Sequence, residues 1–272
     1  MPPLFASNCA FRRNSGFDGD VPTDVGADSL AQLEQQALDA ARMAVEDAVV
    51  QITTIGGLEK VDQVLLAQGP TTGLIISSDG YIVSSAFGLA GHPTSILVRL
   101  PGGKQSVARI VAHNTSRMVV LLKVEAGEPL PTAQPADRKT FRVGEWALAL
   151  GRTFSSERTD VSVGIVSALD RLYGRVIQTD ANISAANYGG PLIDIHGRVL
   201  GVLVPMAPQS GSIQPQSEVA GVEYYDSGIG FAVPLVDLME IFDQWKGGVD
   251  LKPGLMGIGL RRGAPFSTEP MV

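Results

Sequence analysis

The stretch Asp180-Ala-Asn-Ile-Ser-Ala-Ala-Asn-Tyr-Gly-Gly-Pro-Leu192 determines how the rest of the chain is interpreted. It closes on a pair of glycines and runs directly into the apolar, β-branched segment Leu192 to Ile195. This order predicts a tight loop held against the start of a strand. Loops that a rigid scaffold holds in this way commonly carry functional residues. We therefore expect the candidate site in this loop.

Short β-branched segments surround this loop on both sides, and turn residues such as Ser78-Asp79-Gly80 separate them. Strands are predicted over residues 49–55, 61–67, 72–77, 81–84, 95–100, 107–112, 118–124, 146–150, 160–168, 175–179, 191–195, 199–204 and 229–233. Residues 126–140 are rich in Pro and charge and form the predicted connection. Because about six strands fall on each side of this connection, the sequence predicts an all-β fold of two six-stranded β-barrels, over residues 49–125 and 141–233.

Two helices are expected outside the barrels. Apolar residues recur at helical spacing over residues 28–48, where Asp28 or Ser29 is placed to cap the helix and Ser29 with Gln32 forms a capping box. A short helix is predicted over residues 234–246. Residues 1–27 have the composition of a disordered lead, and residues 247–272 form a tail.

Composition limits the classes of function. The 272 residues are 44% hydrophobic and carry a net charge of −7, so the chain lacks the basic surface that nucleic acid binding requires. Cys9 is the single cysteine and cannot form an internal disulfide. The first twenty residues contain no apolar run long enough for a signal-peptide core or a membrane span.

Eight motifs occur in the order found in the HtrA/DegP branch of trypsin-like serine proteases, which the chain resembles over residues 49–236. They are Thr72-Thr-Gly-Leu-Ile-Ile, Asp79-Gly-Tyr-Ile-Val-Ser, Arg142-Val-Gly-Glu-Trp-Ala-Leu-Ala-Leu-Gly151, Ser162-Val-Gly-Ile-Val-Ser-Ala168, Ile177-Gln-Thr-Asp180, Asn187-Tyr-Gly-Gly190, Gly197-Arg-Val-Leu-Gly201 and Gly228-Ile-Gly-Phe-Ala-Val-Pro234. In the central loop, the positions that match the family pattern are Thr179, Asp180, Ala181, Ile183, Asn187, Gly189 and Gly190. The resemblance implies a double β-barrel and serine endopeptidase ancestry.

The resemblance also assigns the positions of the catalytic triad. The family's histidine position holds Phe87, its aspartate position holds Met118 and its serine position holds Tyr188. Phe cannot accept a proton, Met cannot orient an imidazole, and a phenol has a pKa of about 10 without a base beside it. Ala186 replaces the glycine whose amide helps to form the family's oxyanion hole, so the region Ala186, Asn187 and Tyr188 is altered.

We therefore expect that the chain is not an enzyme but a pseudoprotease that binds peptides or acts as a scaffold. Phe87, Met118 and Tyr188 should then meet as an apolar plug in the former cleft. No cofactor is expected. No metal is expected either, because the histidines and the cysteine have no ligand spacing and Asp160, Asp180 and Asp194 fall at strand ends.

Two alternatives remain open. In the first, the chain is a serine-type endopeptidase with a displaced catalytic set, in which His92 or a Tyr188 nucleophile takes part; His113 and His196 fall in turns. In the second, the barrels are a structural spacer for the helix over 28–48 and for a PDZ-like domain. Residues 251–260 resemble the start of such a domain.

Ligand binding is implied by the family resemblance at the segment that borders the specificity pocket, Gly228, Ile229, Gly230 and Phe231, together with Thr179 and Ile183. Capture of a peptide by strand addition does not need a triad. The expected partner is therefore a peptide or protein, with no nucleic acid and no membrane span. The resemblance further implies a homo-oligomer and an extracytoplasmic, periplasmic location.

Overall fold

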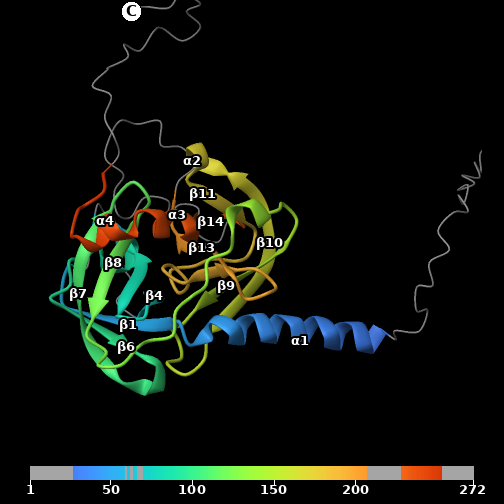
Figure 1. The fold of residues 1–272 in the computed structure, drawn as a ribbon, viewed down its shortest axis with the longest axis horizontal. Helices are drawn as coiled ribbons and strands as arrows, with labels where there is room; N and C mark the ends of the chain where they lie inside the picture. Colours follow the sequence, from blue (N-terminus) through green and yellow to red (C-terminus); the bar gives the residue numbers. More distant parts are fainter. Residues whose placement is uncertain (1–26, 59, 62–63, 66–69, 207–227, 253–272) are drawn as a thin grey trace, which may run out of the picture. The chain divides into compact units, whose positions relative to one another are not determined.

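The computed structural model describes residues 27–58, 60–61, 64–65, 70–206 and 228–252. The expected disordered lead and most of the expected tail lie outside these residues. Short apolar segments form two closed antiparallel barrels, which confirms the predicted fold class, and Figure 1 shows them side by side. No helix within the described parts of the chain is long and apolar enough to cross a membrane.

The first barrel contains six strands whose inward side chains are buried. In chain order they are β1 (Val49–Ile55), β4 (Thr71–Ser77), β5 (Tyr81–Ser85), β6 (Ser95–Arg99), β7 (Gln105–Asn114) and β8 (Val119–Val124), and around the barrel they run β1-β4-β5-β8-β7-β6. Around the range 61–67, where one strand is expected, the described residues form two short antiparallel strands, β2 (Lys60–Val61) and β3 (Val64–Leu65). The short 3₁₀ helices are η1 (Ala86–Leu89) after β5 and η2 (Pro101–Gly103) between β6 and β7.

The second barrel follows the expected connection, which carries the 3₁₀ helix η3 (Arg138–Thr140). Its strands are β9 (Trp146–Gly151), β10 (Asp160–Asp170), β11 (Val176–Thr179), β12 (Pro191–Ile193), β13 (Val199–Val204) and β14 (Gly230–Pro234), with the order β10-β11-β14-β13-β12-β9. A four-residue turn, α2 (Arg171–Gly174), joins β10 to β11. The loop 180–190 leads from β11 into β12, as its sequence predicts.

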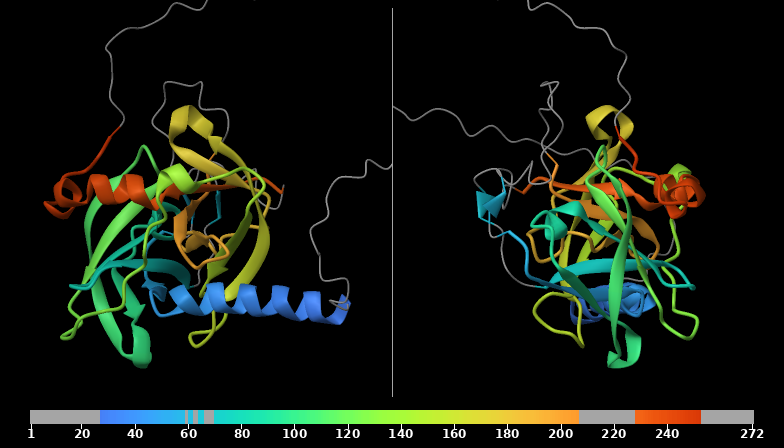
Figure 2. Two further views of the ribbon diagram at one scale, coloured as in Figure 1. Left: turned by 45° about the vertical axis from the view of Figure 1, so that its right-hand side comes forward. Right: turned by 90° about the vertical axis from the view of Figure 1, so that its left-hand side faces the viewer.

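The helices differ in detail from the expected ones. Helix α1 spans Ala27–Glu46, so Ser29 lies within its first turn rather than before it. The apolar run after β14 forms two short helices, α3 (Leu235–Glu240) and α4 (Phe242–Lys246), because Ile241 between them has a non-helical φ of −100°. Both are drawn in orange-red in Figure 2.

The buried side chains form two clusters. The larger cluster holds the interior of the first barrel together with Leu148, Leu150 and Ile193 of the second, so the two barrels share one apolar interface. The smaller cluster fills the second barrel, and Tyr188 belongs to it. The loop 180–190 is thus placed where the second barrel faces the first.

Candidate functional site

The loop before β12 folds as a compact turn centred on Ser184. The Ser184 carbonyl accepts hydrogen bonds from the amides of Asn187 (3.0 Å) and Tyr188 (3.2 Å). The Ser184 hydroxyl accepts from the amide of Ala186 at 3.2 Å, and the Asn187 side chain closes the turn by accepting from the Ser184 amide at 2.7 Å. The amide of Ala186, at the position that the family resemblance assigns to an oxyanion hole, and the amide of Tyr188 therefore both have partners inside the turn.

Threonine hydroxyls from neighbouring strands hold the same turn in place. Thr71 donates to the Tyr188 carbonyl at 3.2 Å, and Thr72 donates to the Ala186 carbonyl at 2.9 Å. Thr153, after β9, donates a short hydrogen bond to the same Ala186 carbonyl. Since Thr71 and Thr72 lie on β4, the first barrel fixes the turn of the second.

The paired glycines allow this close approach. Gly189 has φ of 86°, and a Cβ atom there would lie 2.2 Å from the Thr72 carbonyl oxygen. A Cβ atom at Gly190 would lie 2.0 Å from the Leu150 carbonyl oxygen. Only glycine fits both positions, because real Cβ atoms do not come so close to backbone.

Two of the three residues at the triad positions are in ring contact. The ring centroids of Phe87, in η1, and Tyr188 are 5.5 Å apart with an interplanar angle of 78°, an edge-to-face arrangement. Tyr188 is 4% exposed. Phe87 belongs to the first barrel and Tyr188 to the second, so the two rings form an apolar contact between the barrels.

Met118, the third of these residues, joins the site through its backbone. Its carbonyl accepts from the Ala86 amide at 2.9 Å, next to Phe87, and its φ of 55° marks a left-handed turn before β8. Its side chain is buried in the larger cluster, whereas Phe87 packs against the smaller one. The structure thus brings the three positions together, although the side chain of Met118 packs in a different cluster from the two rings.

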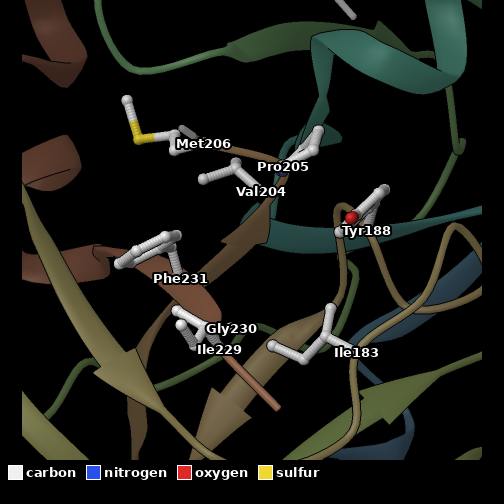
Figure 3. A pocket seen from close by; sticks show the side chains of 8 residues that line it. All are labelled: Ile183, Tyr188, Val204, Pro205, Met206, Ile229, Gly230 and Phe231. Carbon is white, nitrogen blue, oxygen red and sulfur yellow. The ribbon is translucent and has the colours of Figure 1, made fainter. Parts of the chain in front are cut away.

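A small pocket lined by mostly apolar residues opens beside Tyr188 (Figure 3). It is lined by Ile183, Tyr188, Val204, Pro205, Met206, Ile229, Gly230 and Phe231. Its free volume is about 10 Å³, room for about one water molecule. The Ile183 side chain approaches Gly230 so closely that a Cβ atom on Gly230 would lie 2.2 Å from the Ile183 Cδ1 atom. Ile183 therefore fills most of the space that Gly230 leaves free.

Four of the six residues predicted to bind peptide line this pocket: Ile183, Ile229, Gly230 and Phe231. Thr179 is fully buried, donates to the Ile165 carbonyl at 2.8 Å and pairs with Gly230, so it holds the strands rather than lining the pocket. Gly228 and Ile229 precede the ladder of β14 and are exposed. The sequence reasoning missed Val204, Pro205 and Met206, although the Pro that ends the run of β13 was a usable signal.

The polar groups near the turn include one buried cation. The Arg152 backbone amide donates to the Thr72 hydroxyl at 2.8 Å, and its guanidinium donates to the Glu46 carbonyl at 3.1 Å. Burial lowers the pKa of Arg152, while the charges of Glu46 and Asp47 oppose that shift. His92 is exposed and lies beyond η1, with its amide bonded to the Leu89 carbonyl. Among the described residues, no group of three or more His, Cys, Asp or Glu could hold a metal ion.

Comparisons with known proteins agree with this architecture. Residues 71–202 match the model of the trypsin-like peptidase domain. A probable periplasmic serine endoprotease DegP-like from Halomonas elongata is 33% identical over 203 residues, which cover 73% of this chain and 39% of that protein. Proteins of the same name from Pseudomonas fulva (34% over 197 residues, 71% and 38%) and Hahella chejuensis (32% over 197 residues, 71% and 39%) are also similar. The chain spans about two fifths of the length of these relatives.

These names correct one expectation. The residues at the triad positions led to the prediction that the chain is not an enzyme, and that prediction is contradicted by relatives that are named serine endoproteases and point to an enzyme. Phe87, Met118 and Tyr188 are three positions only, whereas the similarity to these proteases extends over more than two thirds of the chain.

Proposed function

Because this chain is a homologue of the HtrA/DegP-type trypsin-like proteases, we propose that it acts on polypeptides, which it binds in extended form beside Gly228 and Ile229. One observation carries the proposal. Gly228 and Ile229 are exposed, pair with no strand of the described residues, and lead directly into the wall of the pocket beside Tyr188. Backbone groups of such a segment can pair with an extended peptide, while the pocket receives one of its side chains.

The size of the pocket supports a small side chain as its occupant. Ile183, Tyr188 and Phe231 fill the space around Gly230, and about 10 Å³ remains. A large ring would have to displace the Ile183 side chain, whereas an alanine methyl group needs only a small adjustment. The substrate or ligand is therefore an extended polypeptide with a small residue at the central position. By the same family relation, we propose an extracytoplasmic location, in line with the periplasmic names of the relatives.

A binding experiment tests this proposal. The full chain is titrated into labelled peptides that differ only in carrying Ala or Phe at the centre, with fluorescence anisotropy as the measurement. Gly230→Val should weaken binding of the Ala peptide about tenfold, because its side chain collides with Ile183. Ile183→Ala should improve binding of the Phe peptide. Val107→Ala, at an exposed site on β7, is the matched control. Equal affinities across all of these proteins would refute the assignment.

A second candidate, hydrolysis by a displaced catalytic set, is favoured by the names of the relatives. The hydroxyls present in the turn are those of Ser184 and Tyr188. The same samples are followed by mass spectrometry of the peptide, and the protein is treated with a fluorophosphonate probe. Cleavage and labelling that both disappear in Ser184→Ala or Tyr188→Phe would establish this candidate. Cleavage that persists in both variants would place the reaction elsewhere.

A further inference from the structure

The turn α2, at the end of the second barrel, has an unusual backbone. Asp170, Leu172 and Tyr173 have φ values of 56°, 52° and 63°, in the left-handed region that favours glycine. Residues with side chains occupy this region only when their surroundings hold them there, and such residues gather at functional sites. Tyr173 is 93% exposed at the tip of this turn. The backbone strain therefore presents an aromatic side chain to solvent.

Arginines hold the turn in this conformation. Arg175 donates from Nε to the Leu172 carbonyl at 2.8 Å and from Nη1 to the Ser116 carbonyl of the first barrel at 3.1 Å. Arg138 donates to the Gly174 carbonyl at 3.0 Å and to the Asp170 carboxylate at 2.6 Å. The conformation of the turn is therefore fixed by groups outside it, including one on the first barrel. Its surface is preorganised for binding.

The charges around the turn do not balance. Arg138 and Arg117 share the carboxylate of Asp237, and Arg138 also pairs with Asp170. Arg171 and Arg175 hydrogen-bond only to neutral oxygens within the described residues, the side chain of Gln178 and two carbonyls. With four guanidinium groups against two carboxylates, the cluster is positive on a chain whose net charge is −7. Arg171 is exposed next to Tyr173.

We propose that the surface formed by Arg171, Tyr173, Arg175 and Arg138, the Tyr173 surface, docks an acidic peptide segment through its side-chain carboxylates. Charge complementarity selects this partner, because a guanidinium fork matches the two oxygens of a carboxylate. An exposed Tyr supplies a rigid contact that costs little conformational entropy and that interfaces commonly use. The surface lies outside the pocket beside Tyr188 and involves none of its lining residues.

The test uses the full chain and three labelled peptides of one length, rich in Glu, in Gln or in Lys. The Glu peptide should bind, binding should weaken as salt is added, and the Gln and Lys peptides should bind at least about tenfold more weakly. Arg171→Glu and Tyr173→Ala should each weaken binding of the Glu peptide about tenfold. Arg142→Glu, the same charge change at an arginine 79% exposed on the same barrel, should change it little.

Three results would overturn the proposal. The Glu peptide fails to bind, the Gln peptide binds as well, or Arg142→Glu weakens binding as much as Arg171→Glu. Circular dichroism checks that each variant is folded. Gly230→Val separates this inference from the proposed function, because it alters the pocket and should leave the Glu peptide bound. Loss of Glu peptide binding in Gly230→Val would place the peptide in the pocket and refute the docking surface.

Discussion

At the scale of single residues, Gly189 combines two requirements for glycine, of which Gly102 meets only one. Its φ is 86°, and its missing Cβ makes room for the Thr72 carbonyl. Gly102 has a similar φ of 79° but nothing lies within 4 Å of the position of its Cβ. A comparison of alanine variants at these two positions therefore distinguishes the cost of backbone strain from the cost of a steric collision.

Gly189→Ala should destabilise the protein by more than about 3 kcal/mol, because it combines an unfavourable φ with a collision against backbone. Gly102→Ala should cost about 1 to 2 kcal/mol, from the φ alone. The measurement is the free energy of unfolding in urea. Equal costs for the two variants would show that the turn moves away from Thr72 without penalty.

Thr72 should be the most important of the hydroxyls that hold the turn, since it donates to the Ala186 carbonyl and accepts from the Arg152 amide. Thr72→Val keeps the shape and leaves both groups without this partner, at a cost of about 2 kcal/mol. Thr54→Val, on β1, is the control, because no hydrogen bond of its hydroxyl is found within the described residues. Thermal unfolding of the two variants measures the difference, and a cost no larger for Thr72→Val would contradict the role.

The sequence predicts the parts of the site that depend on neighbouring residues, and it does not predict the contacts between distant ones. The motif Asn187-Tyr-Gly-Gly190 predicts the tight turn and its place before a strand, because glycine pairs and β-branched runs act locally. The hydrogen bonds from Thr71 and Thr72 to the carbonyls of that turn are not predictable in the same way, since more than a hundred residues separate each donor from its acceptor. Pro205 and Met206 enter the pocket for the same reason: β13 carries them there through its pairing with β14.

At the scale of elements, α4 is fastened to the turn between β4 and β5 by charge. Lys246 of α4 and Lys123 of β8 both lie near the Asp79 carboxylate, at 3.5 and 3.7 Å, and both lie over the ring of Tyr81. A hydrogen bond from Ser77 contributes most to lowering the pKa of Asp79, followed by the charges of Lys123 and Lys246. These contacts favour the ionised carboxylate.

The pH dependence of this contact has a definite sign. Because the pKa of Asp79 is below its ordinary value of 3.8, its contribution to stability is present above pH 3.8 and is lost as the pH falls through the lowered pKa. Ser77→Ala should raise the pKa of Asp79 back toward 3.8, and Lys246→Gln should raise it less. Carboxyl NMR titration measures both. An Asp79 pKa at or above 3.8 in the unmodified protein would contradict the contact.

Secondary-structure elements that depend on neighbouring residues are likewise predicted from the sequence, whereas those that depend on distant residues are not. Short β-branched segments separated by turn residues predict the strands of both barrels, and the structure confirms the two closed sheets. The break at Ile241 is not visible in the helical spacing of Leu235, Leu238 and Phe242, because both short helices pack their apolar residues on the same larger cluster. The left-handed turn α2 is likewise hidden, since Leu172 and Tyr173 have no local preference for it and Arg138 and Arg175 hold it from outside.

At the scale of the whole molecule, the two barrels depend on each other. The larger apolar cluster contains Leu148, Leu150 and Val233 of the second barrel and the interior of the first, and the ring contact of Phe87 with Tyr188 crosses the same boundary. Separating the barrels would expose these side chains, each worth about 1.5 to 3 kcal/mol when fully buried. We therefore expect the barrels to unfold together.

The two tryptophans of the chain allow this expectation to be measured. Trp146 begins β9 of the second barrel and is 46% exposed, whereas Trp245 of α4 is fully buried in the larger cluster with the interior of the first barrel. Trp245→Phe leaves fluorescence from Trp146 alone, and Trp146→Phe leaves that from Trp245. In each variant the urea midpoint from fluorescence should coincide with the midpoint from circular dichroism, as a single cooperative transition requires. A fluorescence transition of Trp146 that precedes loss of the circular dichroism signal would mean that the second barrel unfolds separately, and that the shared interface is too weak to couple the barrels.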